Sequence, residues 1–199
     1  AAIYGARSAS GVILVTTKKG KAGIMQVHYN GYYGTQAPAR KLKLLDATQY
    51  ATLMNESSVA GGQGIKFADP ASLGKGTDWQ DIIFNSAAKI QNHELSISGG
   101  SDKSTYYSSF GYFDQEGIVA SDISKYKRFS LRFNSNHKVK PWLSFGNNVG
   151  YSYIKSSGIG NTNNEFGGIL SSAINLDPIT QAVITDPAQQ AAYPSNDPT

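Results

Sequence analysis

The side chains that could do chemistry are few and scattered. The three histidines, His28, His93 and His137, stand far apart, and no two of them have metal-ligand spacing. Asp78 and Asp81 flank the expected start of a helix, where a carboxylate caps free N–H groups. Cysteine is absent, which excludes thiolate zinc sites, cysteine nucleophiles and disulfides. The sequence therefore predicts no catalytic, cofactor-binding or metal-binding residue, and the chain is not expected to be an enzyme or to need a cofactor.

Sequence motifs of known chemistry are also missing. There is no nucleophile elbow, no phosphate-binding P-loop and no paired-carboxylate motif. The glycine pair at 158 and 160 is expected in a loop, because no strand-to-helix context surrounds it. Trp79 and Trp142 could be platforms for a substrate. Trp142 is more simply an interfacial anchor beside a turn, and Trp79 more simply packs within a loop. No substrate-binding residue can be named.

Composition excludes several classes of protein. The net charge is +4, but the basic residues are scattered apart from short clusters at 18–21 and 125–128. A nucleic-acid-binding protein would gather them on one face, so no nucleic-acid partner is expected. The longest aliphatic run, Val12 to Val15, is far too short for a membrane-spanning helix. An apolar fraction of 40% suits a soluble domain, and it equally suits a membrane barrel, in which only alternate residues are apolar.

Alternating apolar and polar residues predict five strands. The expected ranges are 24–35, 89–99, 103–114, 126–137 and 142–154. In the fourth range, Phe129, Leu131 and Phe133 share one face, and Arg128 and Arg132 lie on the other. The third range carries aromatic residues on both faces, so its orientation stays open. A further strand, apolar on both faces and therefore buried, is expected from Gly11 to Lys18.

The connections between these strands predict loops and short helices. Loops are expected at about 36–87, 115–125 and 156–199. Helices are expected near 45–55, with Asp46 as N-cap, near 78–84, and near 165–175.

Alternation alone leaves two all-β folds open. Strands of about ten residues, alternating short and long connections, and strongly polar faces favour an antiparallel barrel wall in an outer membrane. A soluble all-β domain with long strands would alternate in the same way.

The opening stretch AAIYGARSASGVILVTTKKGK resembles the end of the plug domain in TonB-dependent outer-membrane receptors, specifically the SusC/RagA-like branch. Two later stretches, DWQDIIFNSAAKIQNHELSISGGSDKSTYYSSFGYFDQEGIV and YKRFSLRFNSNHKVKPWLSFGNNVGYS, resemble the first external loop and the following barrel hairpins. The plug-end motif residues, which are expected to be structural, are Tyr4, Gly5, Arg7, Gly11, Thr16, Thr17, Lys18 and Gly20. Arg7 either pairs with a carboxylate of the plug or inner wall or is a solvated arginine on a turn.

The resemblance implies a division of the chain. Residues 1–20 would be the C-terminal end of the plug, and residues 21–199 the N-terminal part of a transmembrane antiparallel β-barrel of 22 strands, with short helices in an external loop. The signal peptide, the TonB box and the rest of the barrel would lie outside this sequence.

The resemblance also implies a function in the bacterial outer membrane. The intact receptor would import a large nutrient, an oligosaccharide or a peptide, without acting on it chemically. Its partners would be membrane lipid, a SusD-like surface lipoprotein, and TonB through a segment that precedes this sequence. The alternative is a surface or secreted all-β binding or adhesion module that transports nothing.

Overall fold

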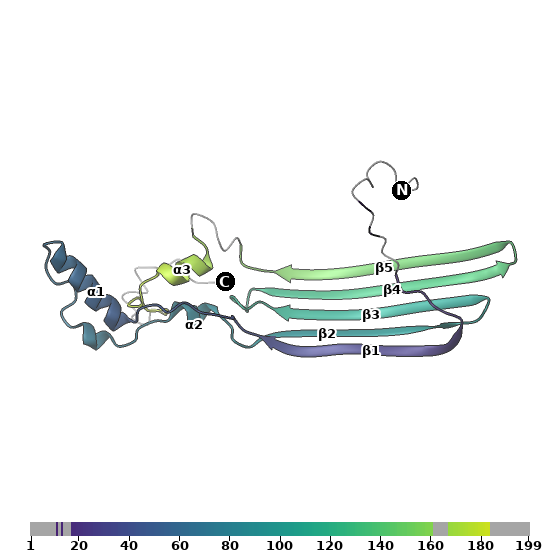
Figure 1. Cartoon of the computed structure of the whole chain (residues 1–199), viewed down its shortest axis with the longest axis horizontal. Helices are drawn as coiled ribbons and strands as arrows, with labels where there is room; N and C mark the ends of the chain where they lie inside the picture. The colour runs from purple at the N-terminus through teal and green to yellow at the C-terminus, as the bar shows by residue number, and fades with distance from the viewer. Residues whose placement is uncertain (1–10, 12, 14–16, 161–166, 184–199) are drawn as a thin grey trace. The chain divides into compact units, whose positions relative to one another are not determined.

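The strands of the chain form one sheet in sequence order. The computed structural model describes residues 11, 13, 17–160 and 167–183. The strands are β1 (Gly23–Gln36), β2 (Ala88–Gly100), β3 (Ser104–Glu116), β4 (Lys125–Lys140) and β5 (Leu143–Ser157). Each lies beside its neighbour in sequence, with β1 and β5 at the edges, and successive strands run in opposite directions (Figure 1). The prediction of an all-β antiparallel sheet is confirmed, and all five expected strands are present.

Two short turns connect neighbouring strands in the way the sequence predicted. Gly100 has a positive φ of 150°, and a Cβ there would lie 2.2 Å from the carbonyl oxygen of Ser104, so the β2–β3 turn requires glycine at this position. The β4–β5 connection consists of Pro141 and Trp142. Proline lacks a backbone N–H and therefore fits a turn better than a ladder position.

The long connections carry the helices, as expected. These are α1 (Ala47–Ala60), the 3₁₀ helix η3 (Pro70–Leu73), α2 (Trp79–Ile83) and α3 (Ile169–Asn175). Asp46 caps α1: its side chain accepts from the backbone N–H of Gln49, whose own side chain accepts from the Asp46 N–H. Asp78 caps α2 in a similar way by accepting from the N–H groups of Gln80 and Asp81, so these aspartates have structural roles.

The chain divides into two compact units. One comprises residues 1–32, 91–113 and 127–154 and contains long parts of all five strands. The other comprises residues 33–90, 114–126 and 155–199 and contains every helix among the described residues.

The sheet has almost no core of its own within the described residues. No large side chain there is fully buried, and the buried apolar residues are mostly alanines of the loop helices. On β4, Leu131 is 52% exposed, and on β5, Phe145 and Tyr151 are each 59% exposed. Such a face is stable only where something apolar covers it, since each exposed large side chain forfeits about 1.5–3 kcal/mol of burial.

The described residues of one further expected strand, Gly11 to Lys18, lie in no strand. Gly11, Ile13 and Thr17–Gly20 belong to no strand, and Ile13 is 93% exposed rather than buried. The other residues of that expected strand, Val12 and Leu14 to Thr16, lie outside the described residues. The five strands β1 to β5 pair with one another in order, and this sheet includes none of the described residues of the stretch.

Candidate functional site

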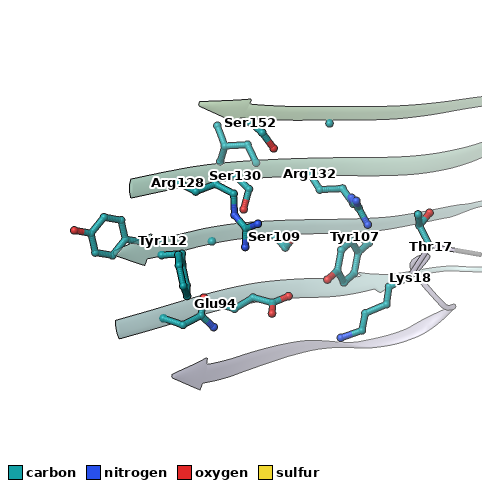
Figure 2. Close-up of a pocket in the computed structure, with 15 residues that line it drawn as sticks. Thr17, Lys18, Glu94, Tyr107, Ser109, Tyr112, Arg128, Ser130, Arg132 and Ser152 are labelled. Carbon is teal, nitrogen blue, oxygen red and sulfur yellow. The ribbon is translucent and has the colours of Figure 1, made fainter. Parts of the chain in front are cut away.

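A polar cavity lies on one face of the sheet, within the unit that contains most of the strands. Its volume is about 460 Å³, and it is lined from β2, β3, β4 and β5 and by Thr17 and Lys18. Figure 2 shows the charged and hydroxyl side chains that surround it. The most informative of these are Lys18, Glu94, Tyr107, Arg128, Ser130 and Arg132.

Strand alternation places these side chains. Arg128, Ser130 and Arg132 are alternate residues of β4 and all line the cavity. Phe129 and Phe133 belong to the expected opposite face and do not line it; they are 40% and 45% exposed. Leu131, which was expected on the same face as these phenylalanines, does line the cavity, so the predicted separation from the arginines holds for Phe129 and Phe133 only.

The charges of the cavity are not neutralised by ion pairs within the described part of the chain. The ion pair between Lys41 and Asp81 lies elsewhere and involves no residue of the cavity. Arg128 instead lies over the ring of Phe113, with its guanidinium carbon 5.6 Å from the ring centre. The guanidinium groups therefore keep donors available to a ligand.

The segment that precedes β1 is fastened to the sheet by Asn134. The side-chain amide of Asn134 donates to the carbonyl oxygen of Lys18 at 2.7 Å, and Asn134 is only 4% exposed. Its own amide oxygen is buried and has no partner among the described residues. Gly20 lies against the backbone of Tyr106, where a Cβ would come within 2.3 Å of the carbonyl oxygen. The sequence did not predict the hydrogen bond between Asn134 and Lys18, because nothing in the pattern distinguishes Asn134 from any other polar residue of a strand.

The structure places only part of the plug-end motif. Tyr4, Gly5, Arg7 and Thr16 lie outside the described residues, as do the alternatives for Arg7. Gly11 has a φ of 111°, a conformation that favours glycine. Thr17 and Lys18 line the cavity, and Gly20 makes the close approach to β3. The structural role of the motif as a whole stays a prediction.

The histidines are held by hydrogen bonds on separate strands. Nδ1 of His93 is 2.6 Å from the hydroxyl of Tyr29, and Nδ1 of His137 is 3.0 Å from Oγ of Ser104. His28 lies 3.4 Å from the side-chain oxygen of Gln26. No group of His, Cys, Asp and Glu residues that could hold a metal ion occurs among the described residues.

His93 also belongs to a row of rings that crosses four strands. The ring centres of Tyr29 and His93 are 6.1 Å apart, those of His93 and Tyr112 are 6.3 Å apart, and those of Tyr112 and Phe129 are 5.0 Å apart. The sequence pattern puts Tyr29, His93 and Phe129 on apolar faces but does not predict the row. In this row Tyr112 of β3 lies beside Phe129 of β4, while Tyr112 and its neighbour Phe113 both line the cavity.

The second unit contains a clasp between two loops that are distant in sequence. We use this name for the contacts of Thr77 and Trp79 with residues 177–180. The Thr77 N–H donates to the Pro178 carbonyl at 2.8 Å, and the Thr77 hydroxyl donates to the Thr180 carbonyl at 2.7 Å. The Trp79 indole N–H donates to the Asp177 carbonyl at 2.8 Å. Trp79 therefore packs a loop, as expected.

Asp177 organises its side of the clasp. Burial opposes the charged form of its carboxylate, but hydrogen bonds from the Thr180 N–H and hydroxyl and from the Ile179 N–H outweigh it. Together they hold the pKa of Asp177 below its usual value. A charged Asp177 therefore stabilises the turn that presents Pro178 and Thr180 to Thr77.

Trp142 lies in the β4–β5 turn and is 76% exposed. The Lys140 ammonium is 5.5 Å from its ring centre. Its position beside a turn matches the expectation, and its role as an interfacial anchor stays a prediction. Among the described helices, none has the length and apolar content needed to cross a membrane.

Comparison with known proteins identifies relatives that match most of the chain. No family model matches the chain. It is 37% identical over 182 residues to "TonB-dependent receptor P3" of Formosa agariphila, covering 89% of this chain and 17% of the relative. It is 39% identical over 135 residues to "TonB-dependent receptor SusC" of Bacteroides thetaiotaomicron, covering 67% of this chain and 12% of the relative. The chain thus spans about a sixth or less of these relatives.

Solved structures agree with the sequence relatives. The chain matches the structure described as "Structure of the RagAB peptide transporter" with a TM-score of 0.70 and 23% identity, covering 90% of this chain and 23% of the other. A structure of the "RagAB peptide importer" in a 'closed-closed' state matches with a TM-score of 0.66 and 25% identity, again covering 90% of this chain and 23% of the other. The sheet is therefore a piece of β-barrel wall, and the relatives are transport receptors rather than enzymes. The chain is a segment of a SusC/RagA-like TonB-dependent receptor.

Proposed function

We propose that the intact receptor imports a large nutrient, an oligosaccharide or a peptide, across the bacterial outer membrane in a TonB-dependent way. The observation that carries this proposal is the 37% identity to a TonB-dependent receptor along almost the whole chain. The RagAB neighbours are described as a peptide transporter, which keeps a peptide among the candidate solutes. The sheet itself offers no chemistry that would alter a solute.

The location of each part follows from the same proposal. Residues 21–199 would form the N-terminal part of the barrel, and residues 1–20 would end the plug that the barrel encloses. The exposed apolar side chains of β4 and β5 would contact membrane lipid, which supports an outer-membrane location. The polar cavity would then face the interior of the barrel.

Two partners belong to the proposal. A SusD-like surface lipoprotein would cover the external side and capture the nutrient. TonB would bind a segment that precedes this sequence and pull on the plug.

Growth and uptake test the proposal. The parent bacterium, a strain lacking the gene of the receptor and a strain lacking TonB would be grown on an oligosaccharide mixture and on a peptide mixture. We expect both deletions to abolish growth on the same mixture and to spare growth on free glucose and amino acids. Unchanged growth without TonB would exclude TonB-dependent import.

The lipoprotein is tested separately. An affinity-tagged receptor, extracted in mild detergent, is expected to copurify with one lipoprotein in a constant ratio. If the receptor imports the nutrient but purifies without a lipoprotein, the transport proposal stands and the proposal of a lipoprotein partner fails.

A further inference from the structure

The cavity on the sheet has an excess of positive charge. Three cationic side chains, Lys18, Arg128 and Arg132, line it together with one carboxylate, Glu94. None of the four takes part in an ion pair among the described residues. Figure 2 shows the two guanidinium groups and the Glu94 carboxylate on the same face of the sheet. A partly enclosed surface of this kind concentrates anions, because low-dielectric walls weaken the screening of its charges.

We infer that this cavity binds anionic groups of the imported solute, with Arg128 and Arg132 as the donors. The inference rests on the proposed import function and names a property of the solute. Guanidinium groups present paired N–H donors that match the two oxygens of a carboxylate or the oxygens of a sulfate. Ser109, Ser130 and Ser152 add hydroxyl groups around the same space.

The spacing of the arginines specifies the solute further. Arg132 lies four positions after Arg128 on the strand, which puts their Cα atoms about 13 Å apart. At this separation each side chain can hold a different anionic group. An extended polymer with several anionic groups can engage both, because acidic residues four apart on an extended peptide repeat at the same distance.

The other groups of the cavity make the inference testable. Glu94 repels an anion, so its removal should strengthen binding rather than weaken it. A Cβ at Gly150 meets nothing within 4 Å, so a large side chain there should project into the cavity without straining the wall.

The experiment measures binding to the purified full-length receptor. Two pairs of probes are compared. The first is a short peptide of Asp and Ser with its neutral match, in which Asn replaces Asp. The second is an oligogalacturonate with its neutral match, an oligogalactose of equal length. The two pairs distinguish a peptide from a sugar as the source of the carboxylates. Uptake is not measured, so failure here leaves the import proposal standing.

We expect one anionic probe to bind more tightly than its neutral match. Arg128→Gln with Arg132→Gln should weaken that probe about tenfold after allowance for solvent screening, and should leave the neutral match unchanged. Glu94→Gln should tighten the anionic probe, and Gly150→Phe should block it. The control is Lys125→Gln with Lys155→Gln, which removes the same charge from residues outside the cavity.

Two results would overturn the inference. One is equal binding of the anionic and neutral probes by the parent receptor. The other is a preference for anions that persists in the double arginine variant or falls equally in the lysine control. Heat-modifiable migration on a gel checks that each variant has formed its barrel.

Discussion

Asn134 shows how one side chain can fix the course of a segment that has no secondary structure. It and the next residue, Ser135, are the two buried residues of β4, and the Asn134 side chain donates to the Lys18 carbonyl. A neutral hydrogen bond of this kind contributes about 1 kcal/mol. That contribution favours the position of the segment against the sheet.

Asn134→Ala should therefore loosen residues 17–23 without disturbing the sheet. Lys18, Lys19 and Lys21 make this segment a set of trypsin sites, so the rate of cleavage there reports its release. We expect cleavage in the intact receptor to become about fivefold faster, as the loss of about 1 kcal/mol implies.

Asn136→Ala is the matched control for that measurement. Asn136 lies on the same strand two residues away and, within the described part of the chain, makes no hydrogen bond to the segment. Equal cleavage rates in the two variants would show that Asn134 does not anchor this segment.

At the scale of elements, the clasp depends on the charge of one turn residue. Because the folded pKa of Asp177 is lowered, its stabilising effect is complete above the pKa of the unfolded chain, about 3.9. The effect is lost as the pH falls through the lower folded value. Acid should therefore open the clasp, and neutral or alkaline pH should keep it closed.

Trp79 reports this opening, because its indole N–H donates to the Asp177 carbonyl. We expect its emission to shift towards longer wavelength as the pH falls below about 4. Asp177→Asn should flatten that dependence in the intact receptor, and Trp79→Phe should abolish the signal, which separates it from the emission of Trp142 and any other tryptophan. A shift of the same size and midpoint in Asp177→Asn would contradict the role of Asp177.

The elements also show what sequence can predict. The strands were predictable because alternation over ten or more residues is typical of strands and does not fit the period of a helix. The first residues of α1 and α2 were predictable because an aspartate that can cap a helix precedes each, at positions 46 and 78. The helix α1 runs beyond its expected end at 55, to Ala60, and Gly61 is its C-cap. The short helix η3 was missed, since Pro70 in a polar loop reads equally well as a turn.

The site was harder to predict than the elements. Alternation predicted the arginine face of β4, because each residue's face follows from its place in the strand. The contact between Asn134 and Lys18 joins positions 116 residues apart, and no local pattern contains it. The buried strand expected at 11–18 was wrong for its described residues, because apolar composition predicts a strand without supplying its partner.

At the scale of the whole molecule, the chain exposes strand edges and apolar side chains that a complete barrel in a membrane would cover. Five strands leave edges at β1 and β5, and apolar side chains stay half exposed across the sheet. Expressed alone in water, these 199 residues should aggregate. Light scattering after dilution from denaturant measures this, with a detergent-containing sample as the control. A monodisperse, water-soluble monomer that melts cooperatively would contradict the barrel-wall assignment.

The order of the strands has a consequence for how the protein folds. Since every strand pairs with its neighbour in sequence, most contacts between strands have low contact order, and the wall can grow one hairpin at a time. The exception is the long connection from β1 to β2. The entropic free-energy cost of closing such a loop rises by only about 0.6 kcal/mol for each doubling of its length. This connection can therefore be lengthened or rebuilt at little cost to the way the strands assemble.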